Sequence, residues 1–208
     1  MDDRSGQGRR RIGVLGGTFD PIHLGHLVAA SESLHRFGLE RVILVPTGRP
    51  WQKARFSDPE DRYLMATLAA ATHQKLSVSR IELDRKGPTY TVETLESFRD
   101  FFGDADLFFI AGADAILELD TWHRFDDLTG LVEVVAVTRP GSDLTGFAPG
   151  PGWPVVHNLE IPGIDISSTD IRRRVAEGLP IDHLVPAAVL RFISERGLYV
   201  GTREARGA

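Results

Sequence analysis

Short hydrophobic runs alternate with longer amphipathic segments along most of the chain. The unbroken runs predict strands covered on both faces of a sheet, and they lie at Ile12 to Leu15, Arg41 to Pro46, Leu107 to Ala111 and Leu131 to Val137. An alternating pattern predicts one more strand, over Leu76 to Leu83. Helix-like segments cover Gly25 to Phe37, Asp58 to Ala71 and Thr91 to Phe102. Ser57 or Asp58 is a suitable N-cap for the middle helix.

This alternation of strands and helices predicts βαβ units. The expected fold class is therefore α/β, with a doubly wound, mainly parallel sheet. In such sheets, ligands bind beyond the carboxyl ends of the strands, near the point where the strand order reverses. Most of the motifs described below come directly after a predicted strand.

The C-terminal quarter has a different pattern. Arg139 to Pro154 holds four prolines and four glycines, and we expect a mobile surface loop there. Val155 to Ile161 predicts a short edge strand. Two helices follow, over Thr169 to Glu177 with Ser168 as the cap and Gly178 at the end, and over Pro186 to Arg196 before Gly197. We expect one domain over residues 11–200 with a small C-terminal helical part, flanked by disordered tails over residues 1–10 and 201–208.

Composition excludes several classes of protein. The 208 residues are 42% hydrophobic and 25% charged, with a net charge of −5, which argues against a general nucleic-acid binder. Cysteine is absent, which fits a reducing compartment. No apolar run approaches membrane-spanning length, and the polar N-terminus does not resemble a signal peptide. We therefore expect a cytoplasmic protein that has no contact with membrane or nucleic acid.

The most informative segment reads GGTFDPIHLGH and spans Gly16 to His26, directly after the first predicted strand. A strand that ends in a glycine turn and continues into a helix is a phosphate-binding arrangement. Free main-chain N–H groups and the positive end of the helix dipole both face the anion. His23 and His26 frame the predicted helix start, where they can add donors to the same phosphates.

Other interpretations of this segment are weaker. It lacks the Gly-Lys-Ser/Thr ending of a P-loop, and its glycines do not have the spacing of the dinucleotide fingerprint. A simple packing turn would not require paired glycines, Asp20-Pro21 and two histidines together. A metal site built from Asp20, His23 and His26 is disfavoured because a further firm ligand is not evident, so we predict no protein metal site.

The chain resembles bacterial nicotinate-nucleotide adenylyltransferases, within the nucleotidyltransferases that carry a His-x-Gly-His signature. The resemblance runs from about Arg11 to Tyr199. The specific motifs beside the signature are GPTYTVET, TWHRF and ISSTDIR. The resemblance implies a Rossmann-like nucleotidyltransferase fold. It also implies an enzyme that joins ATP to nicotinate mononucleotide, giving deamido-NAD and pyrophosphate in NAD biosynthesis, with Mg²⁺ carried on the ATP phosphates.

The resemblance also assigns residues to the ATP. His23 and His26 match the histidines that bind the phosphates during catalysis, and Arg172 matches a catalytic arginine of the ISSTDIR motif. The other predicted ATP contacts are Gly16, Gly17, Thr18, Phe19, Gly112, Asp114, Ser167, Ser168 and Thr169. Two of these positions have a competing interpretation from the residues alone, because Ser167 can form a near capping box with Asp170 and Asp114 can be a helix N-cap.

The mononucleotide contacts implied by the resemblance are Lys53, Thr89, Tyr90 and Trp122. Arg139, which follows another predicted strand, is a further substrate-binding candidate that could neutralise phosphate, with a plain surface charge as the alternative. Lys53 stands in Pro50-Trp51-Gln52-Lys53, where the family usually has Pro-Pro-His-Lys, so the contacts near the missing histidine are open. Main-chain N–H groups around Thr89 and Tyr90 would hold the nicotinate carboxylate, which the positive end of a helix favours over a neutral amide. Trp122 would stack on the pyridine ring, with core packing as the alternative.

Three competing functions remain open. Pantetheine-phosphate adenylyltransferases share the fold but usually carry Thr in place of the first signature histidine. Cytidylyltransferases share both histidines but should lack the GPTYTVET loop and Trp122. A non-catalytic nucleotide sensor could keep the scaffold without the reaction. The expected partners are ATP and nicotinate mononucleotide, and the sequence leaves open whether the protein forms a homo-oligomer.

Overall fold

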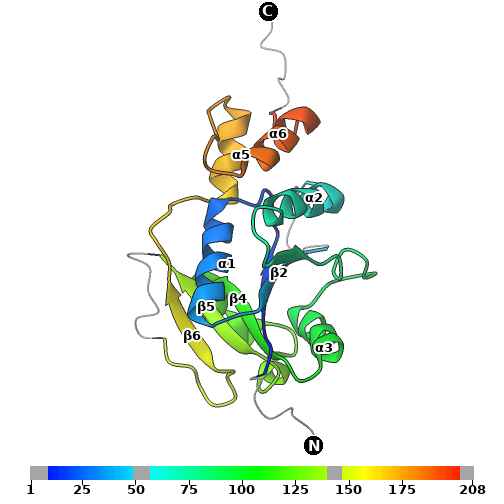
Figure 1. Ribbon diagram of the computed structural model, residues 1–208, viewed down its shortest axis with the longest axis vertical. Helices are drawn as coiled ribbons and strands as arrows, with labels where there is room; N and C mark the ends of the chain where they lie inside the picture. Colours follow the sequence, from blue (N-terminus) through cyan, green and yellow to red (C-terminus); the bar gives the residue numbers. More distant parts are fainter. Residues whose placement is uncertain (1–8, 49–56, 140–146, 202–208) are drawn as a thin grey trace, which may run out of the picture.

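Six parallel strands form one sheet in the computed structural model, which describes residues 9–48, 57–139 and 147–201 (Figure 1). Their order across the sheet is β3-β2-β1-β4-β5-β6, and each neighbouring pair is parallel. This is the order of a doubly wound sheet, so the predicted fold class is confirmed. The strands are β1 (Arg11–Gly17), β2 (Arg41–Pro46), β3 (Leu76–Val78), β4 (Asp106–Gly112), β5 (Glu133–Thr138) and β6 (Val156–Glu160).

Helices cover both faces of the sheet. One face carries α1 (Leu24–Arg36) and α2 (Pro59–Ala70). The other carries α3 (Thr91–Phe102), the short α4 (Ala113–Leu117) and two 3₁₀ turns, η1 (Leu119–Thr121) and η2 (Phe125–Leu128). The C-terminal helices α5 (Ser168–Ala176) and α6 (Ala187–Arg196) stand together beyond the ends of α1 and α2, as Figure 1 shows. They form the predicted C-terminal helical part.

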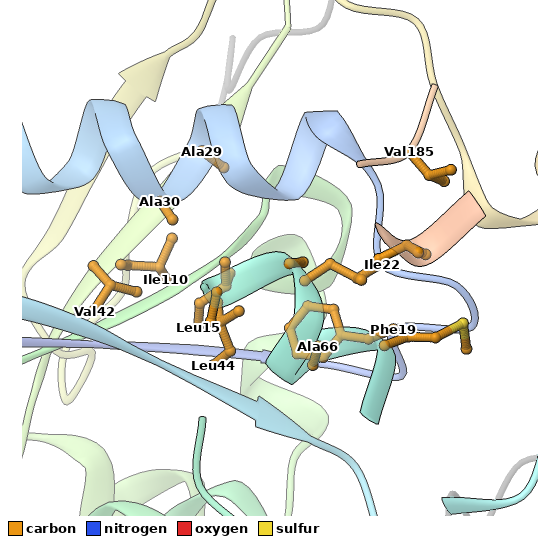
Figure 2. Packing of buried hydrophobic residues seen from close by; sticks show 14 of the residues in the cluster. Leu15, Phe19, Ile22, Ala29, Ala30, Val42, Leu44, Ala66, Ile110 and Val185 are labelled. Atoms are coloured by element: carbon orange, nitrogen blue, oxygen red, sulfur yellow. The ribbon is translucent and has the colours of Figure 1, made fainter. Parts of the chain in front are cut away.

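Alternate residues of the central strands fill two separate cores. Leu15, Leu44 and Ile110 face α1 and α2, where Ala30 and Ala66 let the helices lie close to the sheet (Figure 2). The residues between them on the same strands face α3 and α4, among them Val14, Val45 and Phe109. Strands buried on both sides must be apolar at every position, which is why these runs were readable in the sequence.

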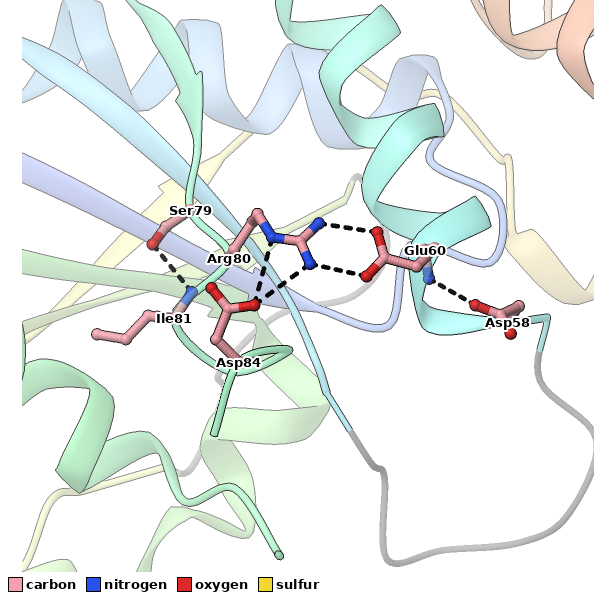
Figure 3. A network of polar contacts seen from close by, with 6 residues as sticks. All are labelled: Asp58, Glu60, Ser79, Arg80, Ile81 and Asp84. Carbon is pink, nitrogen blue, oxygen red and sulfur yellow. Dashed lines mark hydrogen bonds and ion pairs between the residues drawn. The ribbon is translucent and has the colours of Figure 1, made fainter. Parts of the chain in front are cut away.

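The third strand is shorter than predicted. The alternation over Leu76 to Leu83 suggested a strand of that length, but β3 ends at Val78. The reason is Arg80, which leaves the sheet and pairs with Glu60 at the start of α2 through two hydrogen bonds of 2.7 and 2.8 Å, and also with Asp84 (Figure 3). This ion-pair cluster turns the chain away from the sheet edge.

Two helix starts also differ from the sequence predictions. The cap of α5 is Ser167, whose Oγ accepts a hydrogen bond from the Asp170 N–H at 3.1 Å, and not Ser168. Helix α4 was not predicted, and Asp114 lies in its first turn, with Gly112 at the N-cap position. The predicted cap of α2 is correct, because the Asp58 side chain accepts from the Glu60 N–H.

Three predicted features fall largely outside the described residues. These are most of the two tails and the centre of the loop over Arg139 to Pro154; its described part, residues 147–154, holds no helix or strand. Arg10, which we assigned to the N-terminal tail, makes a two-pronged ion pair with Glu40 at 2.7 and 2.9 Å. None of the helices in the described segments is both long and apolar enough to cross a membrane.

Candidate active site

The candidate site lies where the strand order of the sheet reverses. Strand β1 has β2 on one side and β4 on the other, so the chain segments that leave β1 and β4 diverge at this point. Such a divergence opens a crevice at the carboxyl edge of a parallel sheet. The segment from Gly16 to His26 crosses this edge, as predicted from its position after the first strand.

The turn after β1 requires its glycines. A Cβ on Gly17 would lie 3.0 Å from the ring of Phe19, and a Cβ on Gly16 would lie 3.3 Å from the ring of Phe109. Phe19 has a φ of 51° and a fully buried ring, so its side chain anchors a tight left-handed turn. The glycines therefore let the backbone pack closely against the rings of Phe19 and Phe109.

Three main-chain carbonyl groups of this turn accept hydrogen bonds from side chains of α2 and α5. Arg62 of α2 donates to the Thr18 carbonyl at 2.9 Å. Arg172 of α5 donates to the Asp20 carbonyl at 2.6 Å, and Ser168 donates to the Pro21 carbonyl at 2.9 Å. The structure thus joins the GGTFDPIHLGH and ISSTDIR motifs, which are almost 150 residues apart in the sequence.

The two signature histidines lie together at the start of α1. His23 occupies the N-cap position and is only 4% exposed, and its ring stacks on that of His26 with centroids 3.8 Å apart. Nδ1 of His23 is buried and has no hydrogen-bond partner among the described residues. Most buried polar atoms in proteins have a hydrogen-bond partner, so this nitrogen is unusual.

Both imidazoles are neutral at physiological pH. Burial lowers the pKa of His23 to about 4, helped by the charge of Arg139. Burial also holds the pKa of His26 well below its usual range, with further contributions from His23 and Arg139. Arg139 itself stands after β5 and bonds to Asp165 and to the Ile166 carbonyl, just ahead of α5. The predicted Arg139 therefore lies beside the segment that leads into α5.

A cavity of about 280 Å³ adjoins this turn on the side of α3. It is lined by the glycine turn, by Thr89 and Thr91 at the start of α3, by Gly112 and by Trp122, among other residues. Oγ1 of Thr89 is buried and unpaired within the described segments. Trp122 is half-buried, and its ring meets the edge of Phe109 at 5.8 Å. The predicted mononucleotide residues Thr89 and Trp122 thus share one cavity with the predicted ATP turn.

Other predicted residues lie differently. The ring of Tyr90 lies beside that of His123, with the two centroids 4.0 Å apart. Tyr90 is the N-cap residue of α3, so its main chain lies at the start of that helix. Asp114, Ser167 and Thr169 are exposed at helix starts. Lys53 and the neighbouring Trp51 lie outside the described residues, so their contacts stay predictions. No group of three potential metal ligands occurs among the residues that the structure places.

Sequence reasoning missed three buried polar residues that build the site. Arg62 is 1% exposed inside α2. Glu82 lines the 280 Å³ cavity and accepts from Thr94 at 3.0 Å, and burial raises its pKa. Tyr199 donates to the buried carboxylate of Asp20 at 2.6 Å. One signal for Arg62 was present, because an arginine stands on the apolar face of the helix beside Met65 and Ala66.

Comparison with known proteins identifies the family of the chain. Residues 14–174 match the family model described as cytidylyltransferase-like. A relative from Saccharopolyspora erythraea, described as a probable nicotinate-nucleotide adenylyltransferase, is 52% identical over 96% of this chain and 94% of its own length. A relative from Streptomyces coelicolor with the same description is 52% identical over 90% of this chain and all of its own length.

Solved structures share the fold. Nicotinic acid mononucleotide adenylyltransferase from Plasmodium falciparum, in its complex with NaAD, superposes with a TM-score of 0.76 over 92% of this chain and 98% of that chain. The same enzyme in its complex with APC gives a TM-score of 0.74. Sequence identity to the two is 18% and 17%, so this similarity concerns the fold alone.

Proposed function

The chain belongs to the cytidylyltransferase-like family and, within it, to the nicotinate-nucleotide adenylyltransferases, and from this membership we propose the following reaction and residue roles. The protein transfers the adenylyl group of ATP to nicotinate mononucleotide and releases pyrophosphate, a step of NAD biosynthesis. The observation that carries the assignment of roles is the direct contact between α5 and the turn before α1, through Ser168 and Arg172. It brings two helix N-termini, each suited to an anion, to one crevice.

The reaction requires positioning more than acid–base chemistry. The 5′-phosphate of the mononucleotide is already an anion at neutral pH, so it attacks the α-phosphorus of ATP without a general base. The new bond is phosphate oxygen to α-phosphorus, and the bond to the β-phosphate bridging oxygen breaks as pyrophosphate leaves. The barrier comes from holding two anions in line and from neutralising charge in the transition state.

Hydrogen-bond donors around the turn are suited to the triphosphate. His23 and His26 are neutral in the free protein, and each can donate one ring N–H, or become a cation once phosphate oxygens raise its pKa. Arg172 holds the turn through the Asp20 carbonyl and brings a fixed positive charge to the same crevice. The start of α5, with exposed Ser167 and Thr169, offers further donors to the leaving phosphates.

The cavity beside α3 is suited to the pyridine end of the mononucleotide. The start of α3 presents main-chain N–H groups next to Thr89 and Tyr90, and the helix dipole favours a carboxylate there. Trp122 offers an aromatic face on the opposite wall of the cavity. Gly112, at the end of β4, leaves room between the two nucleotides. This arrangement supports a preference for the acid over the amide.

Magnesium fits this site as an ion that enters on ATP. The carboxylate nearest the turn belongs to Asp20, but it is 1% exposed, and its oxygens accept from Tyr199 and from the Ser57 N–H. The other nearby carboxylate, Glu82 in the lining of the cavity, is buried and accepts from Thr94, so neither carboxylate is a free ligand for a metal ion that prefers oxygen ligands. Bound to the phosphates, Mg²⁺ would neutralise charge on the leaving pyrophosphate.

Pyrophosphate release tests the proposal directly. The purified protein is mixed with MgATP and one acceptor at a time: nicotinate mononucleotide, nicotinamide mononucleotide or 4′-phosphopantetheine. We expect pyrophosphate and deamido-NAD with the first acceptor, a rate at least tenfold lower with the amide, and none with the third. Release of pyrophosphate only with 4′-phosphopantetheine would overturn the assignment. If none of the three acceptors led to pyrophosphate release, the protein would be a nucleotide-binding protein without this activity.

A further inference from the structure

Arg62 is a charged side chain buried in the core beneath the site. It projects from α2, is 1% exposed, and donates to four main-chain carbonyls. Nη1 reaches the Thr18 and Thr47 carbonyls at 2.9 and 2.7 Å, Nη2 reaches that of Gly48 at 3.0 Å, and Nε reaches that of Ser57 at 3.2 Å. No carboxylate among the described residues lies within ion-pair distance of it. Burial lowers the pKa of Arg62, yet an arginine remains charged in proteins.

These four carbonyls come from three segments, and two of them, the glycine turn and the end of β2, line the 280 Å³ cavity. Thr18 belongs to the glycine turn, Thr47 and Gly48 follow β2, and Ser57 leads into α2. Burying a cation is costly unless its donors are satisfied. An aliphatic residue would fill this helix position without the desolvation cost of a buried cation. We therefore infer that Arg62 fixes the relative positions of the three segments, in addition to packing α2 on the sheet.

The bond to Thr18 sets the direction of a neighbouring N–H group. The Thr18–Phe19 peptide is trans, since the cis bond in this turn is that between Asp20 and Pro21. In a trans peptide the C=O and the following N–H point in opposite directions. Because Arg62 holds the Thr18 carbonyl toward α2, the Phe19 N–H points away from α2. That N–H donates to no acceptor within the described part of the chain.

We propose that Arg62 is a positioning residue for ATP, which holds the Thr18–Phe19 peptide so that the Phe19 N–H faces the triphosphate. This inference rests on the proposed function for the identity of the anion. Arg62 lies outside the GGTFDPIHLGH and ISSTDIR motifs. Its proposed role is to orient a main-chain N–H of GGTFDPIHLGH that donates a hydrogen bond to phosphate. Arg172 and Ser168 hold two further carbonyls of the same turn, those of Asp20 and Pro21; since proline has no main-chain N–H, the bond from Arg172 fixes the backbone and orients no donor.

The test compares two Arg→Lys variants. In Arg62→Lys a single ammonium group replaces a planar fork, so it cannot serve four carbonyls that lie around the guanidinium. The matched control is Arg99→Lys, because Arg99 of α3 also donates to two main-chain carbonyls, those of Ala105 and Leu131, at the opposite edge of the sheet. Both variants should lose stability, and only the first should lose affinity for ATP.

Calorimetry with the non-reactive analogue α,β-methylene-ATP measures this affinity independently of turnover. We expect the Kd to rise at least tenfold in Arg62→Lys and to stay within twofold of wild type in Arg99→Lys, at a temperature at which all three proteins are folded. A wild-type Kd in Arg62→Lys would overturn the proposal. Equal losses of affinity in the two variants would also overturn it, since they would reflect stability alone.

The Phe19 amide signal in a ¹⁵N-labelled sample gives a second readout. We expect it to shift downfield when wild-type protein is saturated with the analogue. No shift of that signal would overturn the proposal, and this outcome can be observed even where Arg62→Lys does not fold. Failure of the proposed function would appear differently, as binding of the analogue by wild type with no pyrophosphate release from ATP and nicotinate mononucleotide.

Discussion

The main-chain N–H of His23 donates a hydrogen bond of 3.2 Å to Nδ1 of His26. This contact fixes the tautomer of the second histidine. Since Nδ1 is an acceptor, a neutral His26 must carry its proton on Nε2. The ring is held further by stacking on His23 and by the edge of Phe19 at 5.0 Å. The orientation of the His26 ring is thus fixed, and its Nε2–H is a donor with one defined direction.

Loss of this donor should slow catalysis while the fold survives. We expect His26→Ala to lower kcat about 10²–10³-fold, because a preorganised donor to transition-state charge has about that effect. Steady-state kinetics with both substrates measures the change, and circular dichroism checks folding. His35→Ala is the matched control, since His35 is exposed in the last turn of the same helix. A wild-type kcat in His26→Ala would remove His26 from the mechanism.

The buried His23 should make stability sensitive to acid. Its pKa is about 4 in the folded protein, against about 6.5 in an unfolded chain. Between these values the unfolded state binds the extra proton, so the free energy of unfolding falls as the pH drops from about 6.5 to 4 and is unaffected above this window. The expected loss from this group between pH 7.5 and 4.5 is about 2–3 kcal/mol.

Urea denaturation of wild type and His23→Asn at these two pH values tests the point. Asparagine is a favourable N-cap residue, so the helix start is preserved while the titrating ring is removed. The difference in unfolding free energy between the two pH values should be smaller in the variant by the stated amount. Equal differences in the two proteins would show that His23 is not the group responsible.

Removal of the Trp122 ring should affect one substrate selectively. We expect Trp122→Leu to raise KM for nicotinate mononucleotide about fivefold, because an aromatic contact contributes about 1 kcal/mol beyond its buried area. KM for ATP should change less than twofold. Trp153→Leu is the control, since Trp153 packs against Phe125 and Phe147. Equal effects on both KM values would favour a packing role for Trp122.

The bond between Tyr199 and Asp20 should stabilise the fold. The phenol donates to the buried carboxylate at 2.6 Å, and removal of a hydrogen bond to a charged group costs about 1.5–3 kcal/mol. We expect Tyr199→Phe to lower the free energy of unfolding by that amount in urea. Tyr63→Phe, at a half-buried tyrosine of α2, should change it by less than about 0.5 kcal/mol. A neutral Tyr199→Phe would contradict this role.

Much of the architecture was readable from local pattern. The bounds of β2 and α3 agree with those predicted, since a strand buried on both faces and an amphipathic helix each leave a periodic signal. The length of the strand predicted over Leu76 to Leu83 was overestimated, because the alternating pattern continues beyond the end of β3 at Val78. In that continuation Arg80 pairs with Glu60 of α2. Nothing in the local pattern of that strand indicates a partner twenty residues earlier.

By itself, the sequence determined most of the strands and helices, the place of the glycine turn after β1, and the motifs on which the family resemblance depends. Tertiary structure alone decided which groups hold that turn: Arg62 to Thr18 across 44 residues, and Arg172 to Asp20 across 152. The physical reason is that secondary structure follows from short-range periodicity and burial, whereas a bond between a side chain and a distant carbonyl depends on how whole helices pack on the sheet. Such contacts leave no repeating pattern in the chain.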